Sequence, residues 1–403
     1  MRIGRQRSAS EKMCRACRAI GLCPKGAAMN KSDLNAQKET YRLSVIIPCY
    51  NEMATLQRCV ASVMSIASDN LTLEIIIVDD CSTDDSPAIA TELAAQHSII
   101  RLLRHEKNTG KGAAIRSGIS EASGDFVAIQ DADLEYDPKD LVRLIEPLAA
   151  RKADVVIGSR FLSSGPHRVL YFWHSIGNKF LTLLSNMLTD LNLTDIECGY
   201  KVFHRNIFND IIIEENGFGF EPEIVAKIST KRLRIYEMSV SYDGRTYAQG
   251  KKITWKDGLK AIYCILHYNL PYCPTYIQFV AYLFVGCVAG IVNVWVFLLL
   301  YSSNFPLEFA TPTAFVIAAV VNYLLCIVFV FRHKARWGNL SEIVIYCGIF
   351  FTGAALDLLI TKLVFNAGNS PAVAKITATA LVLMFNFLGR RYVVFPLAGK
   401  GQW

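Results

Sequence analysis

The sequence lacks both glycine-rich motifs by which many proteins hold a nucleotide. No Gly-x-x-x-x-Gly-Lys-Ser/Thr run occurs, which excludes a P-loop. Residues 110–115, Gly-Lys-Gly-Ala-Ala-Ile, are without the third small residue of a dinucleotide-binding fingerprint. If this chain binds a nucleotide, other residues must hold it.

Charged residues are also scarce. They make up 19% of the chain, against 52% for hydrophobic residues, and the apolar excess follows Pro274. The net charge of +7 is spread out, without a basic stripe interleaved with aromatic residues, so we do not expect nucleic-acid binding. We attribute the positive charge to the bias of cytoplasmic loops in membrane proteins and to affinity for anionic lipid headgroups.

The amino-terminal segment lacks the apolar stretch of a signal peptide. We interpret residues 1–41 as a disordered tail or an upstream extension, with Met29 as a second possible start. Within it, Cys14, Cys17 and Cys23 have metal-like spacing, but no fourth ligand is evident. The other cysteines are scattered, so we expect reduced, cytosolic thiols.

Apolar segments alternate with helical patterns between residues 42 and 245. Short runs rich in β-branched residues predict strands, and the stretches between them predict helices, which indicates an α/β domain with a mainly parallel sheet. Asn51 is a suitable N-cap for the first helix. The predicted strands are 43–48, 73–78, 99–103, 126–130 and 155–158, and the predicted helices are 51–64, 82–96 and 111–122.

Polar residues gather where these predicted strands end. Asp131 and Asp133 follow the strand at 126–130, and Asp80 follows the strand at 73–78. Ligands of parallel sheets bind at the carboxyl ends of the strands. Two carboxylates one residue apart suit a hard cation such as Mg²⁺ or Mn²⁺, which bridges diphosphate oxygens. The sequence therefore predicts a metal-diphosphate site at this edge.

The carboxyl-terminal part of the chain predicts a membrane domain of four helices, because its apolar spans approach or reach the ~20 residues needed to cross a bilayer. Basic residues lie between the second and third spans and after the fourth, which places both termini in the cytoplasm. Two amphipathic stretches, 171–190 and 253–268, are expected either in the membrane interface or in the core. The predicted spans are 277–301, 310–331, 343–365 and 372–388.

These patterns divide the chain into four parts. They are a tail over 1–41, an α/β domain over 42–245, juxtamembrane interfacial helices over 246–275 and an all-α transmembrane domain over 276–403. A diphosphate site joined to a membrane anchor points to an enzyme that uses a water-soluble activated donor and a lipid acceptor.

Five ordered motifs carry a resemblance to a known family. They are residues 47–52 (Ile-Pro-Cys-Tyr-Asn-Glu), 78–84 (Val-Asp-Asp-Cys-Ser-x-Asp), 108–112 (Asn-Thr-Gly-Lys-Gly), 131–135 (Asp-Ala-Asp-Leu-Glu) and 158–160 (Gly-Ser-Arg). In this order they resemble the family 2 glycosyltransferases of GT-A fold, in the dolichol-phosphate mannose synthase-like, polyprenyl-phosphate branch. The resemblance covers residues 42–268, and the membrane part resembles the GtrA-like four-helix domains.

The resemblance implies a donor site built from the first four motifs. The residues implied to hold the nucleotide base and ribose are Pro48, Tyr50, Glu52, Val78 and Asp80. The residues implied to meet ribose, diphosphate and a Mg²⁺ or Mn²⁺ ion are Asp131, Ala132, Asp133 and Glu135, with the three carboxylates as metal ligands. The family often has Gln at the position of Glu135. The loop around Lys111 is interpreted as a turn, with a ligand contact as the alternative.

The resemblance also implies catalytic roles for a second set of residues. Arg160 would face phosphate, and Arg245 and Lys251 would clamp the acceptor or the leaving diphosphate. Asp195 matches an acidic family position, where it would contact a sugar hydroxyl or, alternatively, act as a general base. An arginine usual before the amphipathic helix is not evident, because Trp-His occupies residues 173–174.

The chemistry that the resemblance implies needs no general base. A polyprenyl phosphate has a second pKa near ~6, so at cytosolic pH it is already a nucleophilic dianion. Catalysis would then rest on in-line positioning, on the metal ion that neutralises the diphosphate, and on the basic residues. Direct attack opposite the nucleotide would invert the sugar carbon.

We therefore expect an integral, multi-pass membrane enzyme of a bacterial or archaeal cell membrane, with its catalytic domain in the cytoplasm. Its partners would be a GDP- or UDP-linked hexose, a polyprenyl or dolichyl phosphate and the bilayer. Further copies of the same chain, in a homo-oligomer, are the other partner considered. A processive polysaccharide synthase is the alternative enzyme, but its Gln-x-x-Arg-Trp motif is absent. Another acceptor, or a lipid-linked sugar flippase or scaffold whose soluble domain only binds, remain as alternatives.

Overall fold

The computed structural model describes residues 40–162, 168–169, 171–245, 255–331, 339–369 and 371–394. The predicted tail with its three cysteines, and Lys251, lie outside the described residues.

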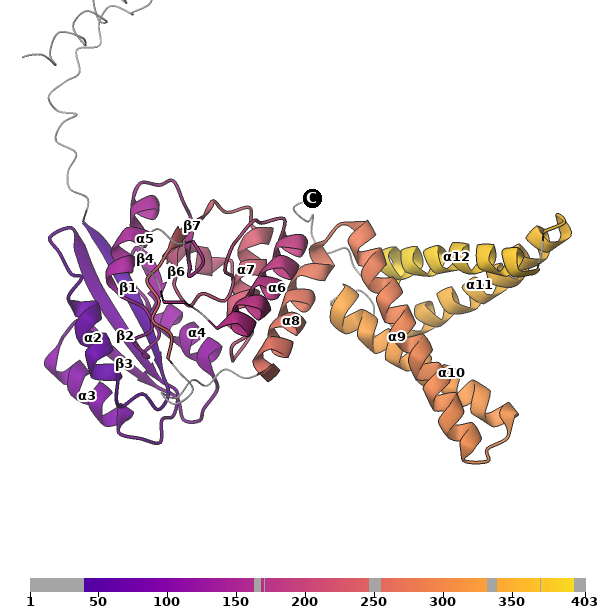
Figure 1. The fold of residues 1–403 in the computed structure, drawn as a ribbon, viewed down its shortest axis with the longest axis horizontal. Helices are drawn as coiled ribbons and strands as arrows, with labels where there is room; N and C mark the ends of the chain where they lie inside the picture. Colours follow the sequence, from indigo (N-terminus) through magenta and orange to yellow (C-terminus); the bar gives the residue numbers. More distant parts are fainter. Residues whose placement is uncertain are drawn as a thin grey trace, which may run out of the picture. The chain divides into compact units, whose positions relative to one another are not determined.

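In the described part of the chain, the strands form one sheet in the order β3-β2-β1-β4-β6-β5-β7 (Figure 1). β6 pairs antiparallel with β4 and β5, and the other neighbours pair in parallel. The mainly parallel α/β sheet that the sequence predicts is therefore confirmed. The strands are β1 (Tyr41–Cys49), β2 (Leu71–Asp79), β3 (Ile100–Arg104), β4 (Phe126–Ile129), β5 (Val155–Ser159), β6 (Lys201–His204) and β7 (Ile235–Ser239).

Helices cover both faces of the sheet because successive strand side chains point to opposite sides. Leu43 and Val45 of β1 pack in one core with the helices α2, α3 and α5. Ile46 points the other way, into a core with Ala114 of α4. The covering helices are α2 (Leu56–Met64), α3 (Ser86–Gln96), α4 (Lys111–Glu121), α5 (Lys139–Ala149) and α7 (Phe220–Thr230).

The prediction that Asn51 caps the first helix is wrong. Asn51 has a positive φ of 54°, and α2 begins five residues later, at Leu56. Its side-chain oxygen accepts a hydrogen bond from Thr83 N at 2.8 Å instead. Asn51 thus ties the end of β1 to the loop after β2, a contact between segments that local sequence does not encode.

The second predicted helix also starts later, at Ser86 rather than Ser82. Asp84 accounts for the difference, since its carboxylate accepts from Ser86 N at 3.0 Å and from Met53 N at 3.1 Å. The sequence analysis did not predict α5, β6, α7 or β7. β6 is four residues long and begins with the fully buried Lys201, which breaks the apolar pattern.

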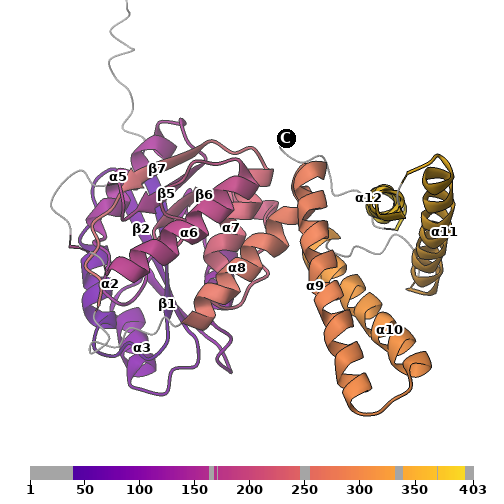
Figure 2. The same cartoon turned by 45° about the vertical axis from the view of Figure 1, so that its right-hand side comes forward.

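The two predicted amphipathic stretches are the helices α6 (Phe172–Thr189) and α8 (Trp255–Asn269), which pack side by side (Figure 2). α6 leaves large apolar side chains on its outer face: Trp173 is 80% exposed and Met187 60%. α8 buries Ala261, Cys264 and Ile265 in the core. The exposed face of α6 fits the interfacial alternative, and α8 serves the core along one face.

The predicted membrane helices are present as α9 (Thr275–Ser302), α10 (Leu307–Leu325), α11 (Asn339–Asn366) and α12 (Pro371–Gly389). They pair as two hairpins, α9 with α10 and α11 with α12. Short π-helices, η5 (Cys326–Phe331) and η6 (Arg390–Val394), extend α10 and α12. Among the described residues, one helix, Thr275–Leu300, is both long and apolar enough to cross a membrane, with a mean hydropathy of 2.5.

Candidate active site

Most of the residues implied to hold the donor lie at or just after the carboxyl ends of the central parallel strands β1, β2 and β4. The register sets Cys49 of β1 beside Asp79 of β2, and Ile46 of β1 beside Ile129 of β4. The segments that follow these strands therefore leave the sheet at one edge, where parallel sheets bind ligands. Tyr50 is 39% exposed at this edge.

Two of the residues implied to contact the nucleotide are buried: Val78 is 0% and Ala132 3% exposed. Pro48, another residue implied to hold the base and ribose, is the neighbour of Val78 in the parallel pairing of β1 with β2. Val78 and Ala132 therefore do not present their side chains at the surface of this edge.

Asp80 organises the loop between β3 and α4. Its carboxylate accepts hydrogen bonds from Thr109 N at 2.9 Å, from Gly110 N at 2.7 Å and from His105 Nδ1 at 2.6 Å. Burial raises the pKa of Asp80, but these hydrogen bonds outweigh it and hold the pKa below its ordinary value. Asp80 thus shapes the loop that presents Lys111.

The loop needs both of its glycines. Gly110 has a φ of 100°, a conformation that side chains other than glycine rarely adopt. A Cβ on Gly110 would overlap the carbonyl oxygen of Asn216, and one on Gly112 would overlap that of Glu215. The absence of side chains lets the start of α4 lie directly against residues 215–217.

Lys111 joins two carboxylates in the site. Its Nζ lies 2.8 Å from Asp131 Oδ1 and 2.9 Å from Glu221 Oε1. The two negative charges raise the pKa of Lys111 despite its burial, so the amine stays charged. Lys111 thus meets one of the predicted metal ligands, and its contact with a bound ligand stays a prediction.

Arg245 lies among three of the predicted site carboxylates. Its Nη2 lies 3.2 Å from Asp133 Oδ2, and its Nη1 lies 3.3 Å from Glu52 Oε2. Its backbone N donates to Glu135 Oε1 at 2.8 Å. Tyr242 donates to the other oxygen of Glu135 at 2.8 Å. The structure thus brings Glu52, Asp133, Glu135 and Arg245 together, and the roles implied for them stay predictions.

The carboxylates here are crowded. Burial, followed by the charges of Asp131 and Glu135, raises the pKa of Asp133 to about 7, although Arg245 opposes the shift. In the described residues, no three His, Cys, Asp or Glu side chains already converge as a metal site. The oxygen donors nonetheless suit a hard cation, and an added positive charge would relieve the repulsion that this pKa reflects.

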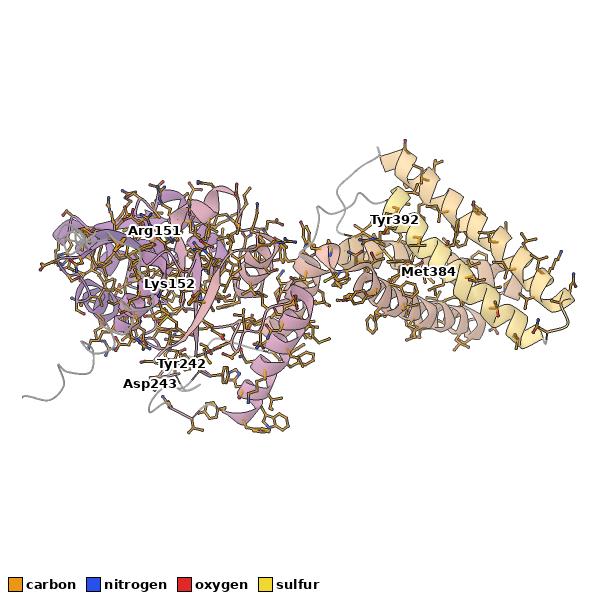
Figure 3. All side chains as sticks on the ribbon, turned by 90° about the horizontal axis from the view of Figure 1, so that it is seen from above. Arg151, Lys152, Tyr242, Asp243, Met384 and Tyr392 are labelled. Carbon is orange, nitrogen blue, oxygen red and sulfur yellow. The ribbon has the colours of Figure 1, made fainter. Side chains whose placement is uncertain are left out.

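A cavity of about 610 Å³ opens beside this cluster. Glu52, Asp133 and Arg245 line it together with Arg58 and Arg168. Figure 3 shows Tyr242 and the lining residue Asp243 next to each other in the segment after β7. The cavity has room for a small polar ligand, with charges of both signs on its wall.

Arg160 and Asp195 form a separate, buried pair. Arg160 donates to both oxygens of Asp195, from Nε at 2.7 Å and from Nη2 at 2.8 Å. Asp195 is fully buried, and Asn178 donates to it at 3.2 Å. The Arg160 guanidinium also lies 5.2 Å from the centre of the Tyr242 ring, whose hydroxyl binds Glu135. Tyr242 therefore links this pair to the carboxylate cluster.

Sequence reasoning missed the buried layer behind Asp131. Glu221 pairs with Lys111 through Oε1, and its Oε2 is buried without a hydrogen-bond partner. Glu197 is half-buried and has one buried oxygen without a hydrogen-bond partner, and desolvation together with the charge of Glu221 raises its pKa to about 8. A Cβ on Gly199, two residues after Glu197, would overlap Asp131 Oδ2. Both residues belong to the short acidic segment 195–199, and this segment is the sequence signal that could have identified them.

Two family models match this chain. The model described as "Glycosyl transferase family 2" matches residues 44–212. The model described as "GtrA/DPMS, transmembrane domain" matches residues 281–395. The first covers the sheet from β1 to β6 and the candidate-site carboxylates up to Asp195, but it ends before β7 and Arg245. The second spans most of α9 to η6.

Individual proteins match over longer stretches. A dolichol-phosphate mannosyltransferase of Pyrococcus furiosus is 24% identical over 359 residues, which cover 88% of this chain and 97% of that protein. An undecaprenyl-phosphate mannosyltransferase of Micrococcus luteus is 28% identical, over 52% of this chain and 87% of that protein. Among solved structures, glucosyl-3-phosphoglycerate synthase from Mycobacterium tuberculosis aligns with a TM-score of 0.45 and 20% identity, over 61% of this chain and 86% of that one.

Proposed function

Since the chain is a family 2 glycosyltransferase that carries a GtrA/DPMS transmembrane domain, we propose that it transfers a sugar from a nucleoside-diphosphate donor to a polyprenyl phosphate. The two relatives named above, which carry polyprenyl phosphates in their names, support the acceptor. The observation that carries the proposal is the position of Arg245, which contacts three carboxylates at the wall of a cavity.

The donor lies over the ends of β1, β2 and β4 in this proposal. Pro48, Tyr50, Glu52, Val78 and Asp80 form the base and ribose side, with Asp80 acting through the loop that it orders. The donor is a GDP-mannose or a UDP-glucose type of nucleotide sugar. Glu52 lies on the cavity wall, where its carboxylate would accept a hydrogen bond from a ribose hydroxyl.

A divalent cation, Mg²⁺ or Mn²⁺, fits the carboxylates of Asp131, Asp133 and Glu135. When bound, it supplies positive charge to the diphosphate that leaves the sugar. Asp131 already pairs with Lys111, and the other two carboxylates pair with Arg245. These two basic residues keep the carboxylates compensated in the absence of ligand and are placed to meet diphosphate oxygens.

The acceptor reaches the site from the membrane surface. The exposed Trp173, Phe180 and Met187 on α6 form an apolar face that fits the interface of a bilayer. Arg245, with Lys251 beyond the described residues, guides the lipid phosphate toward the sugar. The dianionic phosphate attacks the sugar carbon opposite the nucleotide, with inversion. This arrangement requires the catalytic domain and both termini on the cytoplasmic side.

Asp195 has a positioning role in this mechanism. Both of its oxygens bind Arg160, and its side chain is fully buried, so neither oxygen is free to remove a proton from an acceptor. A phosphate nucleophile needs no such base. Asp195 holds Arg160, and through Tyr242 this pair fixes Glu135.

A transfer assay tests the proposal. Full-length protein in detergent is incubated with undecaprenyl or dolichyl phosphate, Mg²⁺ or Mn²⁺ and a panel of labelled GDP- and UDP-sugars. We expect label in the lipid phase with one donor, and its loss in Asp133→Ala and after chelation of the metal. Asp210→Ala, which changes an exposed carboxylate that does not line the cavity, serves as the matched control.

Binding of a nucleotide sugar without transfer to any lipid phosphate would overturn the proposal. It would favour another acceptor, or a flippase or scaffold whose soluble domain only binds. Transfer that survives in Asp133→Ala would show that the carboxylate cluster is not the site.

A further inference from the structure

Arg390 is a buried arginine at the end of α12, where the chain continues as the π-helix η6. It is 7% exposed. Its Nη1 donates to Asn322 Oδ1 at 2.6 Å and lies 3.8 Å from Cys326 Sγ. The guanidinium also lies 4.6 Å from the ring centre of Tyr346 and 5.3 Å from that of Tyr282. Every one of these partners is neutral.

These contacts come from all four membrane helices. Tyr282 belongs to α9, Asn322 to α10, Tyr346 to α11, and Arg390 itself follows α12. Among the described residues, the two polar side chains that contact Arg390 Nη1, Asn322 and Cys326, are uncharged. Two aromatic faces offset part of the cost of burying the charge, and a buried cation whose observed partners are all neutral is suited to an anion.

The surrounding segments repeat a short pattern. Asn322-Tyr-Leu stands four residues before Cys326, where η5 begins, and Asn386-Phe-Leu stands four residues before Arg390, where η6 begins. The hairpin α9–α10 and the hairpin α11–α12 thus end in the same short pattern. Arg390, at the end of the α11–α12 hairpin, hydrogen-bonds Asn322 in the α9–α10 hairpin. The side-chain oxygen of the matching Asn386 is buried without a hydrogen-bond partner. Interfaces between such repeats, and π-helical turns, are places where membrane proteins bind ligands.

This end of the helices is the one that adjoins the catalytic domain. His267 of α8 donates from Nδ1 to the carbonyl of Val328 in η5 at 2.8 Å, and the ring of Tyr263 meets that of Phe329. Figure 3 shows Tyr392, two residues beyond Arg390, at the same end of α12, with Met384 further along the helix. Because α8 precedes the first membrane helix, we expect the cluster to lie at the level of the lipid headgroups on the side of the catalytic domain.

We propose that Arg390, with Asn322, Tyr282 and Tyr346, binds the phosphate of a membrane lipid phosphate at a site separate from the catalytic cavity. Arginine suits a phosphate monoester because its planar donors pair with two oxygens at once. That the lipid is a polyprenyl phosphate rests on the proposed function; that the ligand is a lipid-borne phosphate rests on this cluster alone. No bond is made or broken there.

Photolabelling tests the site in the full-length protein in phosphatidylcholine nanodiscs. The probe is a polyprenyl phosphate with a photoreactive group near its phosphate, and the labelled peptides are mapped. We expect labels on segments around 322–331 and 390–394, with at least ~10-fold less label from the matching polyprenol, which lacks the phosphate. Equal labelling by the alcohol would overturn the proposal.

Three variants separate phosphate binding from packing. Arg390→Met should abolish the label, whereas Arg391→Met, which removes the same charge one residue later, should keep it. Asn322→Asp gives Arg390 the carboxylate that it lacks in an almost isosteric side chain, so this variant should fold well and still lose the label. Unchanged labelling in Asn322→Asp would overturn the proposal even if Arg390→Met fails to fold.

Two further results bear on the ligand. Millimolar inorganic phosphate, added as a competitor, should leave the photolabelling unchanged. Loss of label in its presence would show that the site binds a free anion, and this would overturn the lipid assignment. The transfer assay distinguishes this failure from failure of the proposed function. In the parent protein, transfer without labelling of these segments would sink only the second site, and labelling without transfer would sink only the proposed function. Asn322→Asp keeps the catalytic residues intact, so we expect it to lose the label and still form the catalytic site.

Discussion

Asp195→Asn tests whether Asp195 positions Arg160 or acts on the acceptor. The substitution keeps the shape of the side chain but replaces a carboxylate oxygen, which accepts from Arg160 at 2.7 or 2.8 Å, with an amide that itself donates. Asp195 is fully buried, so no solvent replaces the lost charge. Removing one partner of a buried ion pair costs ~3–5 kcal/mol, because the other charge stays uncompensated.

The assay is thermal unfolding of the full-length protein in detergent, followed by the transition of the catalytic domain. For a domain of this size class, ~1 kcal/mol moves the midpoint by roughly 2–4 °C, so Asp195→Asn should lower it by roughly 6–20 °C. Asp190→Asn is the matched control: Asp190 is exposed with a φ of 55°, a conformation that Asn tolerates, and its midpoint should not move.

The double variant Arg160→Met/Asp195→Asn completes the test. Removing both charges should recover much of the lost stability, since no buried charge is left alone. A midpoint for Asp195→Asn within about 2 °C of the parent, together with a ~100-fold loss of transfer at saturating substrate, would refute this reasoning. It would assign Asp195 to the chemistry as a general base.

Three other predictions follow from the same structure. Gly112→Ala should cost ~1–3 kcal/mol, since its Cβ would overlap the carbonyl of Glu215, while Gly177→Ala, with open space around it, should be neutral or stabilising in thermal unfolding. Glu197 has a pKa raised from 4.5 to about 8, so the folded state holds this proton more tightly than the unfolded state does. The free energy of unfolding should therefore fall as pH rises from 4.5 to 8, by at most ~1.4 kcal/mol per pH unit. Glu197→Gln should remove this pH dependence from the unfolding midpoints measured from about pH 5 to 8. Trp173→Ser should raise the KM for the lipid phosphate several-fold and leave kcat unchanged, and an unaltered KM would exclude α6 from acceptor binding.

The sheet and the edge that carries the site were predictable because their signals are local. Apolar runs such as 43–48 mark strands wherever they occur, and polar residues directly after them fall at the ligand-binding edge of a parallel sheet. The ordered motifs then indicated which of those residues belong to the site. The exposed face of α6 followed from its helical periodicity.

The partners of these residues were not predictable, because they come from distant segments. Lys111 meets Glu221, and Arg245 meets Glu52, across separations of 110 and 193 residues. Asn51 looked like a helix cap and instead binds Thr83, which belongs to another loop. Arg390 is a basic residue at a helix end in the sequence, and only the packing of four helices buries it among neutral groups.

The most direct test of the central claim is the mass and anomeric configuration of the lipid product. Full-length protein is supplied with the accepted nucleotide sugar and a polyprenyl phosphate of defined length, and the lipid extract is analysed by mass spectrometry and by NMR. The account predicts one product, the polyprenyl monophosphate carrying a single hexose, with the configuration inverted relative to the donor. A ladder of several sugars, retention of configuration, or free sugar as the main product would contradict it.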